Sequence, residues 1–343
     1  MNRVFAYRTA LAALTFSIAC VAHAGIFGKK DSGAEVKVIN SGPFKGKSTL
    51  AIGAFRVTFK THDTVVSVAG GALMGHGGSS VTDDTTLSGI DHAQMQKIAD
   101  AIYADFIQQA ADKGYTIVDS VKLAAASPEY KALPTTTSFT EGPFGYFVIP
   151  TGQTSPIMPT DDYKQERHGA QTFGASFKGI GAQTAKTEAN AVFPKVGKDT
   201  GAAVIQVNIV VNYAAYKGTQ SAWMSNSKAT VDFGATIEGV DTALMGTMIK
   251  AWDARTPDCG NCMAVAYLKG NVHSSEPMGA AEKRDALGAS GNIGNAIGAL
   301  TGGSIAKHKA YDFTAEPAAY EKNSLAVAKE ATEMLLGEIA KEK

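Results

Sequence analysis

The chain has 343 residues, with 32 lysines and arginines against 32 aspartates and glutamates, and 45% of its residues are hydrophobic. This charge balance gives no long-range attraction for nucleic acid or for an anionic membrane surface, so neither is an expected partner. The length allows a sizeable core, in one large domain or in one domain with insertions.

Residues 1–24 have the pattern of a cleavable export signal. Arg3 and Arg8 precede an apolar run of roughly a dozen residues, and residues 22–24 read Ala-His-Ala before a glycine. A transmembrane anchor would need about 20 apolar residues, and this run is shorter. The pattern predicts a mature protein outside the cytoplasm, in the periplasm or secreted.

The chain has three cysteines, and they support two separate predictions. Cys20 follows a weak lipobox, in which Ser17 stands where leucine is usual, so lipidation there is an alternative to simple cleavage. Cys259 and Cys262 form a C-x-x-C pair between two strand-like segments. A redox pair would place its first cysteine at a helix N-terminus, whereas Cys259 follows a strand-like segment and precedes another. We therefore predict a small disulfide that closes a hairpin loop, and a thiol/disulfide enzyme is the alternative.

The first half of the mature chain alternates strands and helices. Asp91 with Gln94 resembles a capping box, in which the Gln94 side chain reaches back to the free amide of Asp91. Apolar residues then recur at helical spacing as far as Lys113, and Gly114 provides a stop. The expected segments are a flexible leader (25–47), a strand (48–61), a loop (69–89), a helix (91–113), a short strand (115–119) and a second helix (121–133).

The second half is dominated by strands and interrupted by two insertions. Residues 203–216 alternate most clearly, with Ile205, Val207 and Ile209 on one side and Gln206 and Asn208 on the other. The expected segments are an insertion rich in Pro, Thr and Gly (134–200), strands (203–216 and 228–238), a hairpin around the cysteine pair (246–254 with 262–272), a second insertion (274–310) and a last amphipathic helix (317–340).

This order, β-α-β-α-β-β-β-α, predicts an α+β fold. A mixed β-sheet would carry helices packed on one face, within a single domain that covers residues 48–343.

No catalytic constellation is recognisable. The loop at residues 42–48 has one residue too few for a phosphate-binding loop, and it precedes a strand instead of following one. No two histidines of the mature chain are spaced as a helical metal-ligand pair. We predict no catalytic residue, no metal site and no cofactor.

Gly294, Gly298 and Gly302 recur every four residues within the second insertion. Small residues at this spacing let helices approach closely, so the three glycines are a possible self-association surface. The alternative is a flexible loop of glycine and alanine.

Several segments together resemble a known group. The strand, long helix and short strand of the first half are followed by Ala202–Ile209, by a hairpin that contains Asp253 and Thr256, and by a C-terminal helix. This arrangement resembles the curli-secretion-channel (CsgG) and TolB-amino-terminal-like group of bacterial envelope proteins. Asp253 and Thr256 match that group's Asp and Thr-Gly turn, whereas Pro257 replaces the glycine.

The resemblance implies a subunit in the periplasm or associated with the outer membrane, which binds protein partners and sometimes assembles as a ring. We therefore expect a non-enzymatic envelope protein that acts in secretion, assembly or scaffolding, with other envelope proteins or further copies of itself as partners. Two alternatives are an exported enzyme that uses Cys259 and Cys262, and a periplasmic small-molecule-binding protein whose long loops form a lid.

Overall fold

The computed structural model describes residues 33–69, 79–142, 144–156, 188–219, 228–240, 246–256, 263–284 and 305–343. These residues form an α+β fold with mixed sheets, as the sequence predicted. The export signal lies outside the described residues, so its cleavage stays a prediction.

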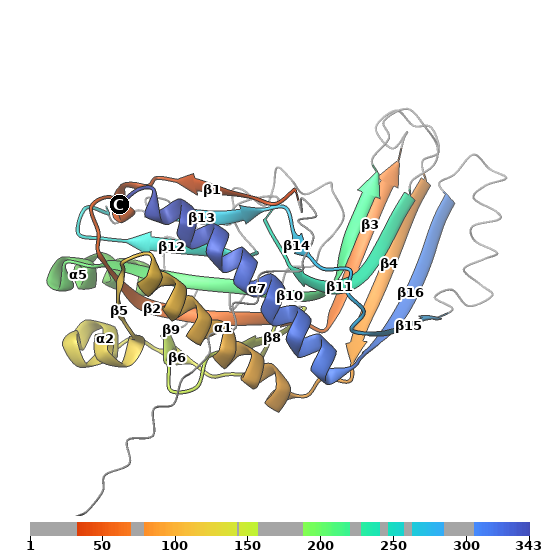
Figure 1. Cartoon of the computed structure of the whole chain (residues 1–343), viewed down its shortest axis with the longest axis horizontal. Coiled ribbons are helices and arrows are strands. Elements are labelled where there is room, and N and C mark those ends of the chain that lie inside the picture. Colours follow the sequence, from red (N-terminus) through yellow and green to blue (C-terminus); the bar gives the residue numbers. More distant parts are fainter. Residues whose placement is uncertain are drawn as a thin grey trace, which may run out of the picture. The chain divides into compact units, whose positions relative to one another are not determined.

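Ten of the described strands form the main sheet (Figure 1). Its order is β1-β13-β12-β10-β2-β8-β7, with β5 beside β2, β11 beside β10 and β14 beside β11. The central pair, β10 and β2, is parallel, and β12 joins the other side of β10 in antiparallel orientation. The strands are β1 (Glu35–Ile39), β2 (Thr49–Lys60), β5 (Thr116–Val118), β7 (Thr140–Gly142), β8 (Gly145–Val148), β10 (Ala203–Thr219), β11 (Lys228–Ile237), β12 (Met248–Trp252), β13 (Ala264–Lys269) and β14 (Val272–His273).

A second sheet has the order β15-β16-β4-β3, and β16 and β4 run parallel at its centre. Its strands are β3 (His62–Ala69), β4 (Ser79–Ser88), β15 (Gly279–Arg284) and β16 (Ile305–Ala315). A short pair, β6 (Thr135–Thr136) and β9 (Ser155–Pro156), completes the described strands.

The helices are α1 (His92–Asp112), α2 (Ser120–Ala126), α3 (Pro128–Lys131), α5 (Glu188–Thr200) and α7 (Pro317–Ala340), together with a 3-10 turn, η1 (Gly42–Phe44). Helix α1 begins where the sequence predicts, because the Asp91 carboxylate accepts a hydrogen bond from the Gln94 amide. The Gln94 side chain does not reach back to Asp91. It donates instead to Glu321 and to the Pro317 carbonyl, both on α7.

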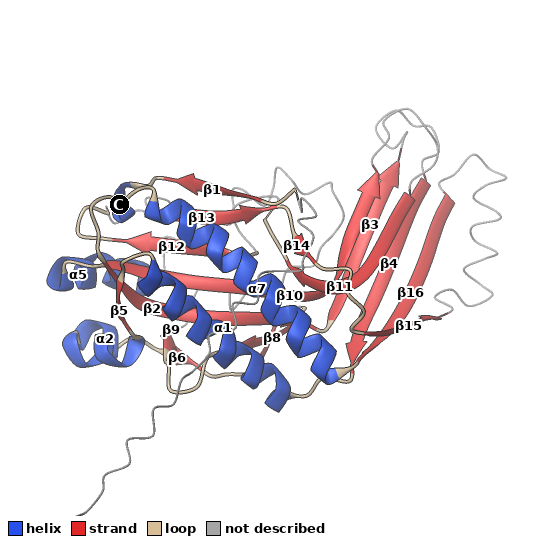
Figure 2. Cartoon of the chain, in the orientation of Figure 1, coloured by secondary structure: helices blue, strands red, loops and turns tan. Residues whose placement is uncertain are grey.

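The main sheet is covered on both faces, and this corrects part of the prediction. The two long helices, α1 and α7, lie side by side across one face, against alternate residues such as Ile52 and Ile205 (Figure 2). The shorter α2, α3 and α5 pack on the opposite face, against Ala51 and Val204. Gly53 belongs to this second face, where a Cβ would lie 2.9 Å from the Phe193 ring of α5, so a larger residue would force neighbouring side chains to shift.

Several segments that the sequence predicts as leader, loop or insertion contain strands in the structure. Residues 35–39 of the expected leader form edge strand β1, paired with β13. The expected loop (69–89) contains β4, and the second insertion contains β15 and most of β16. Of these strands, β4, β15 and β16 lack a strong apolar alternation, and their order comes from pairing with distant segments.

Two helical regions also differ from the prediction. The helix expected over 121–133 is two short helices, because Ser127 ends α2 and caps α3 just before Pro128. The first insertion contains α5, which the sequence did not indicate because Pro194 lies inside it. The strands at 203–216 and 228–238 and the hairpin of β12 with β13 are confirmed.

Candidate functional site: a buried polar cluster between the two sheets

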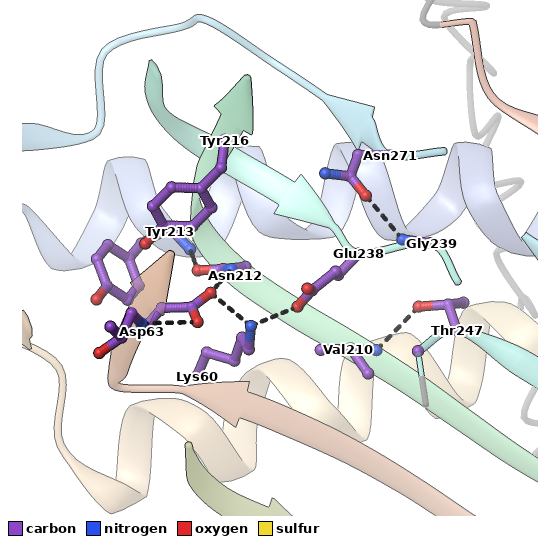
Figure 3. A network of polar contacts seen from close by, with 12 residues as sticks. Lys60, Asp63, Val210, Asn212, Tyr213, Tyr216, Glu238, Gly239, Thr247 and Asn271 are labelled. Atoms are coloured by element: carbon purple, nitrogen blue, oxygen red, sulfur yellow. Dashed lines mark hydrogen bonds and ion pairs between the residues drawn. The ribbon is translucent and has the colours of Figure 1, made fainter. Parts of the chain in front are cut away.

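The two sheets are joined through continuous chain. β2 ends at Lys60 in the main sheet, and β3 begins at His62 in the second sheet, with only Thr61 between them. β10 continues beyond its pairing with β2 into a long hairpin with β11. Charged and hydroxyl groups meet where these strands converge (Figure 3). We call this set the junction cluster: Lys60, Asp63, Thr85, Asn212, Tyr213, Tyr216 and Glu238.

Lys60 lies at the centre of the junction cluster. Its Nζ donates to Asp63 Oδ2 at 2.5 Å and lies 2.8 Å from Glu238 Oε2. The Lys60 and Asp63 side chains are 4% and 1% exposed, so both charges are almost fully removed from water. A buried charge is tolerated when it is paired and hydrogen-bonded, and leaving it alone is costly.

Asp63 receives further hydrogen bonds from the backbone and from β10. The Thr64 amide donates to its Oδ1 at 3.0 Å, and Asn212 Nδ2 donates to its Oδ2 at 3.2 Å. Asn212 also accepts from the Tyr213 amide. One carboxylate therefore connects β2, β3 and β10.

The hydroxyl groups form the other half of the cluster. Thr85 Oγ1 on β4 lies 2.7 Å from the Tyr213 hydroxyl and 2.5 Å from that of Tyr216. Burial raises the pKa of both phenols above the ordinary value, and the Asp63 charge adds to the effect. Both tyrosines therefore act as neutral hydrogen-bonding groups.

Aromatic stacking holds the second sheet against the β10–β11 hairpin. The ring of Phe313 on β16 stacks on Tyr213 at 5.9 Å between centroids and on Phe233 at 5.1 Å. Tyr311 meets Phe233 edge-on. The junction cluster thus lies beside an apolar contact, and its polar groups fix how the two sheets meet.

The segments that follow β11 are also fastened to the main sheet (Figure 3). Thr247 Oγ1 accepts from the Val210 amide, and Asn271 Oδ1 accepts from the Gly239 amide. Glu238 is consequently held at the edge of the cluster. The arrangement supplies charge balance and hydrogen bonds between strands, which suits a structural coupling of the two sheets.

The turn after β12 brings Asp253 and Thr256 together. The Asp253 amide donates to Thr256 Oγ1 at 2.9 Å, and Asp253 Oδ2 accepts from Arg255 Nε at 2.7 Å. Lys47 Nζ lies 3.7 Å from the same carboxylate, and Arg255 also donates to backbone carbonyls at Gly42 and Lys45. Asp253 is therefore the buried anchor of a turn that fastens the η1 loop.

The other predicted site residues lie outside the described part of the chain. Cys259 and Cys262 fall in residues 257–262, and Gly294, Gly298 and Gly302 fall in residues 285–304. The disulfide and the glycine self-association surface therefore stay predictions.

The sequence does not indicate the junction cluster. Lys60 and Asp63 end an apolar run, and Asn212 reads as the polar side of an alternating strand. The spacing of these residues along the sequence matches no recognisable motif, because the cluster is assembled from strands that are far apart in the chain. Within the described residues, no group of His, Cys, Asp or Glu side chains is placed to hold a metal ion. The described helices also include none with the length and apolarity to cross a membrane.

Comparisons with family models, with curated proteins and with solved structures find no match for this chain.

Proposed function

We propose that this chain is a non-enzymatic, exported protein of the cell envelope, which acts in secretion, assembly or outer-membrane-associated scaffolding through protein–protein contacts. The export pattern of residues 1–24 supports the location in the periplasm or outside the cell. The single observation that carries the mode of action is that β15 is the terminal strand of the second sheet among the described strands.

All six residues of β15 are exposed, and among the described strands β15 pairs only with β16. Met278 directly precedes β15, and its carbonyl accepts a hydrogen bond from the Glu316 amide, which directly follows β16. This bond continues the register of the β15–β16 pair, so Met278 directs its backbone groups toward the β16 side. Because these directions alternate along a strand, Gly279, Ala281 and Lys283 direct their N–H and C=O groups outward. Such an edge can add a strand from another chain.

Exposed apolar residues offer little alternative for protein contact on the described surface. Ile39 and Val121 are the exposed large hydrophobic residues within the described residues, and they lie on different elements, β1 and α2. An extended apolar docking patch is therefore not visible there. The charges of Glu282, Lys283 and Arg284 would discourage arbitrary pairing. A partner strand would need complementary charges, which favours a defined self-association or a dedicated envelope partner.

The test is the native mass of the mature protein after extraction from envelopes in mild detergent. We expect a defined multi-subunit species or a co-purifying envelope protein. Ala281→Pro should abolish the assembly, because proline removes the outward N–H while the N–H groups that face β16 remain. Ala281→Val keeps the N–H and is the matched control.

A strictly monomeric wild-type protein that retains no envelope protein would contradict the proposal. Assembly that survives Ala281→Pro unchanged would show that the contact lies elsewhere. The melting temperature of each variant, measured first, shows whether the fold is retained.

A further inference from the structure

Lys250 and Gln206 form an unmatched polar pair on the face of the main sheet that carries α2, α3 and α5. They are direct cross-strand neighbours on β12 and β10, so their side chains point to the same face. The residues two positions before Gln206 and two positions after Lys250, Val204 and Trp252, belong to the apolar cluster of that face. The pair is therefore a polar interruption within this apolar face.

Gln206 is 5% exposed, and its buried Oε1 has no hydrogen-bond partner among the described residues. Most buried polar atoms in folded proteins have a partner, so this oxygen is open to a donor that the described residues do not supply. A group that donates a hydrogen bond at this position would remove the cost of burying the amide oxygen.

Within the described part of the chain, the Lys250 ammonium lacks a hydrogen-bond acceptor, just as Gln206 Oε1 lacks a donor. Its ammonium makes no hydrogen bond or ion pair with any residue in the described ranges, although its side chain is only partly exposed. Removal from water lowers the pKa of this amine to about 8, with no carboxylate to oppose the effect. Other partly or fully buried lysines are paired, such as Lys60 with Asp63 and Glu238. Lys250 therefore needs an anion.

We propose that the Lys250–Gln206 pair is a binding site for a small α-hydroxy carboxylate. The carboxylate would accept hydrogen bonds from the Lys250 ammonium, and the neighbouring hydroxyl would donate to Gln206 Oε1. Directly opposed residues on antiparallel strands have Cβ atoms about 5 Å apart, a separation that a ligand of this size can bridge. Met248 and Val265 provide apolar walls on the same face.

The experiment is a thermal-unfolding titration of the purified protein with sodium glycolate, sodium acetate and sodium chloride at equal ionic strength. Glycolate at a concentration about ten times its dissociation constant should raise the melting temperature by about 2–3 °C. Acetate should bind more weakly than glycolate because it lacks the hydroxyl, and chloride should have no effect.

Three variants locate the response. Lys250→Met should remove it for both carboxylates, and Gln206→Leu should remove the difference between glycolate and acetate. Lys97→Met, at an exposed lysine on α1 that pairs with Glu321, is the matched control and should respond like the wild type.

The pH dependence gives a second readout. The folded-state pKa of Lys250 lies below its unfolded value, so without ligand the Lys250 contribution should become more favourable as pH rises from about 8 to about 10.5. The other titratable and charged side chains on this face include Tyr130 on α3, Tyr267 on β13 with Lys37 opposite it on β1, and Arg56 on β2, which donates to Ser155 and Pro156. Lys250→Met should remove this rise, and the glycolate response of the wild type should fade over the same range.

Equal melting shifts with all three salts, or a glycolate shift that persists in Lys250→Met, would overturn the proposal. A wild-type protein with no response to glycolate at any tested concentration would overturn it as well. None of these outcomes bears on the assembly through β15, which is measured separately by native mass.

Discussion

At Lys60, one ammonium group faces the carboxylates of Asp63 and Glu238 in a nearly water-free position. The Coulombic gain of such an arrangement is offset by the cost of desolvating the charges, so its net contribution to stability is small. Deleting one partner is different, because the remaining charges stay buried without their opposite charge. The main role of the junction cluster is therefore to specify how β2, β3, β10 and β11 meet.

We predict that Lys60→Met lowers the free energy of unfolding by about 3–5 kcal/mol, because Asp63 and Glu238 lose their shared cation. Urea-induced unfolding at neutral pH measures the change. Lys97→Met removes an exposed ion pair with Glu321 and should cost only about 0–1 kcal/mol. A loss for Lys60→Met no larger than for Lys97→Met would mean that the cluster tolerates its two carboxylates without the lysine.

Helix α1 shows how far local sequence determines an element. Asp91 caps the helix, residues at helical spacing such as Met95, Ile98 and Phe106 are buried, and Gly114 has a φ of 78° just after the end. All of these features are local, and all were predictable. The direction of the Gln94 side chain was not, because Glu321 on α7 competes for it more than 200 positions away in the chain.

We predict that Asp91→Ala destabilises the protein by about 1 kcal/mol, because the Gln94 amide loses the acceptor that lies 2.8 Å away. Asp91→Asn keeps an oxygen at the same position and should stay close to the wild type. Thermal unfolding of the three proteins at one pH measures the difference. If the alanine and asparagine variants were equally destabilised, the carboxylate charge, and not the cap hydrogen bond, would be the stabilising feature.

The whole molecule depends on the contact between its two sheets. Strand β10 belongs to the main sheet along its first part, and beyond that its Tyr213 stacks on Phe313 of the second sheet. Thr85 adds hydrogen bonds from β4 to the same region. With chain continuity at Thr61, apolar stacking and a buried polar cluster, we expect the two sheets to unfold as one cooperative unit.

We predict that Phe313→Ala lowers the free energy of unfolding by about 3–5 kcal/mol, because a buried ring that contacts Tyr213 and Phe233 is lost. Native-state hydrogen exchange should show the same decrease at amides of β12, in the main sheet, and of β4, in the second. Phe313→Leu keeps much of the apolar volume and should lose less. Faster exchange confined to β3, β4 and β16 would show that the second sheet opens independently.

The sequence by itself determined the elements whose signals are local. The α+β class, helices α1 and α7, the central strand β10 and the hairpin of β12 with β13 all follow from periodicity, capping and turn residues, which act over a few positions. The tertiary structure alone decided the second sheet, since β4 carries polar residues such as Asp83 and Thr85 that can be buried only once distant strands supply their partners. It also decided the junction cluster and the Lys250–Gln206 pair. Each joins side chains from separate strands, and the interactions of a charge or an amide depend on what lies next to it in space and not on its neighbours in the chain.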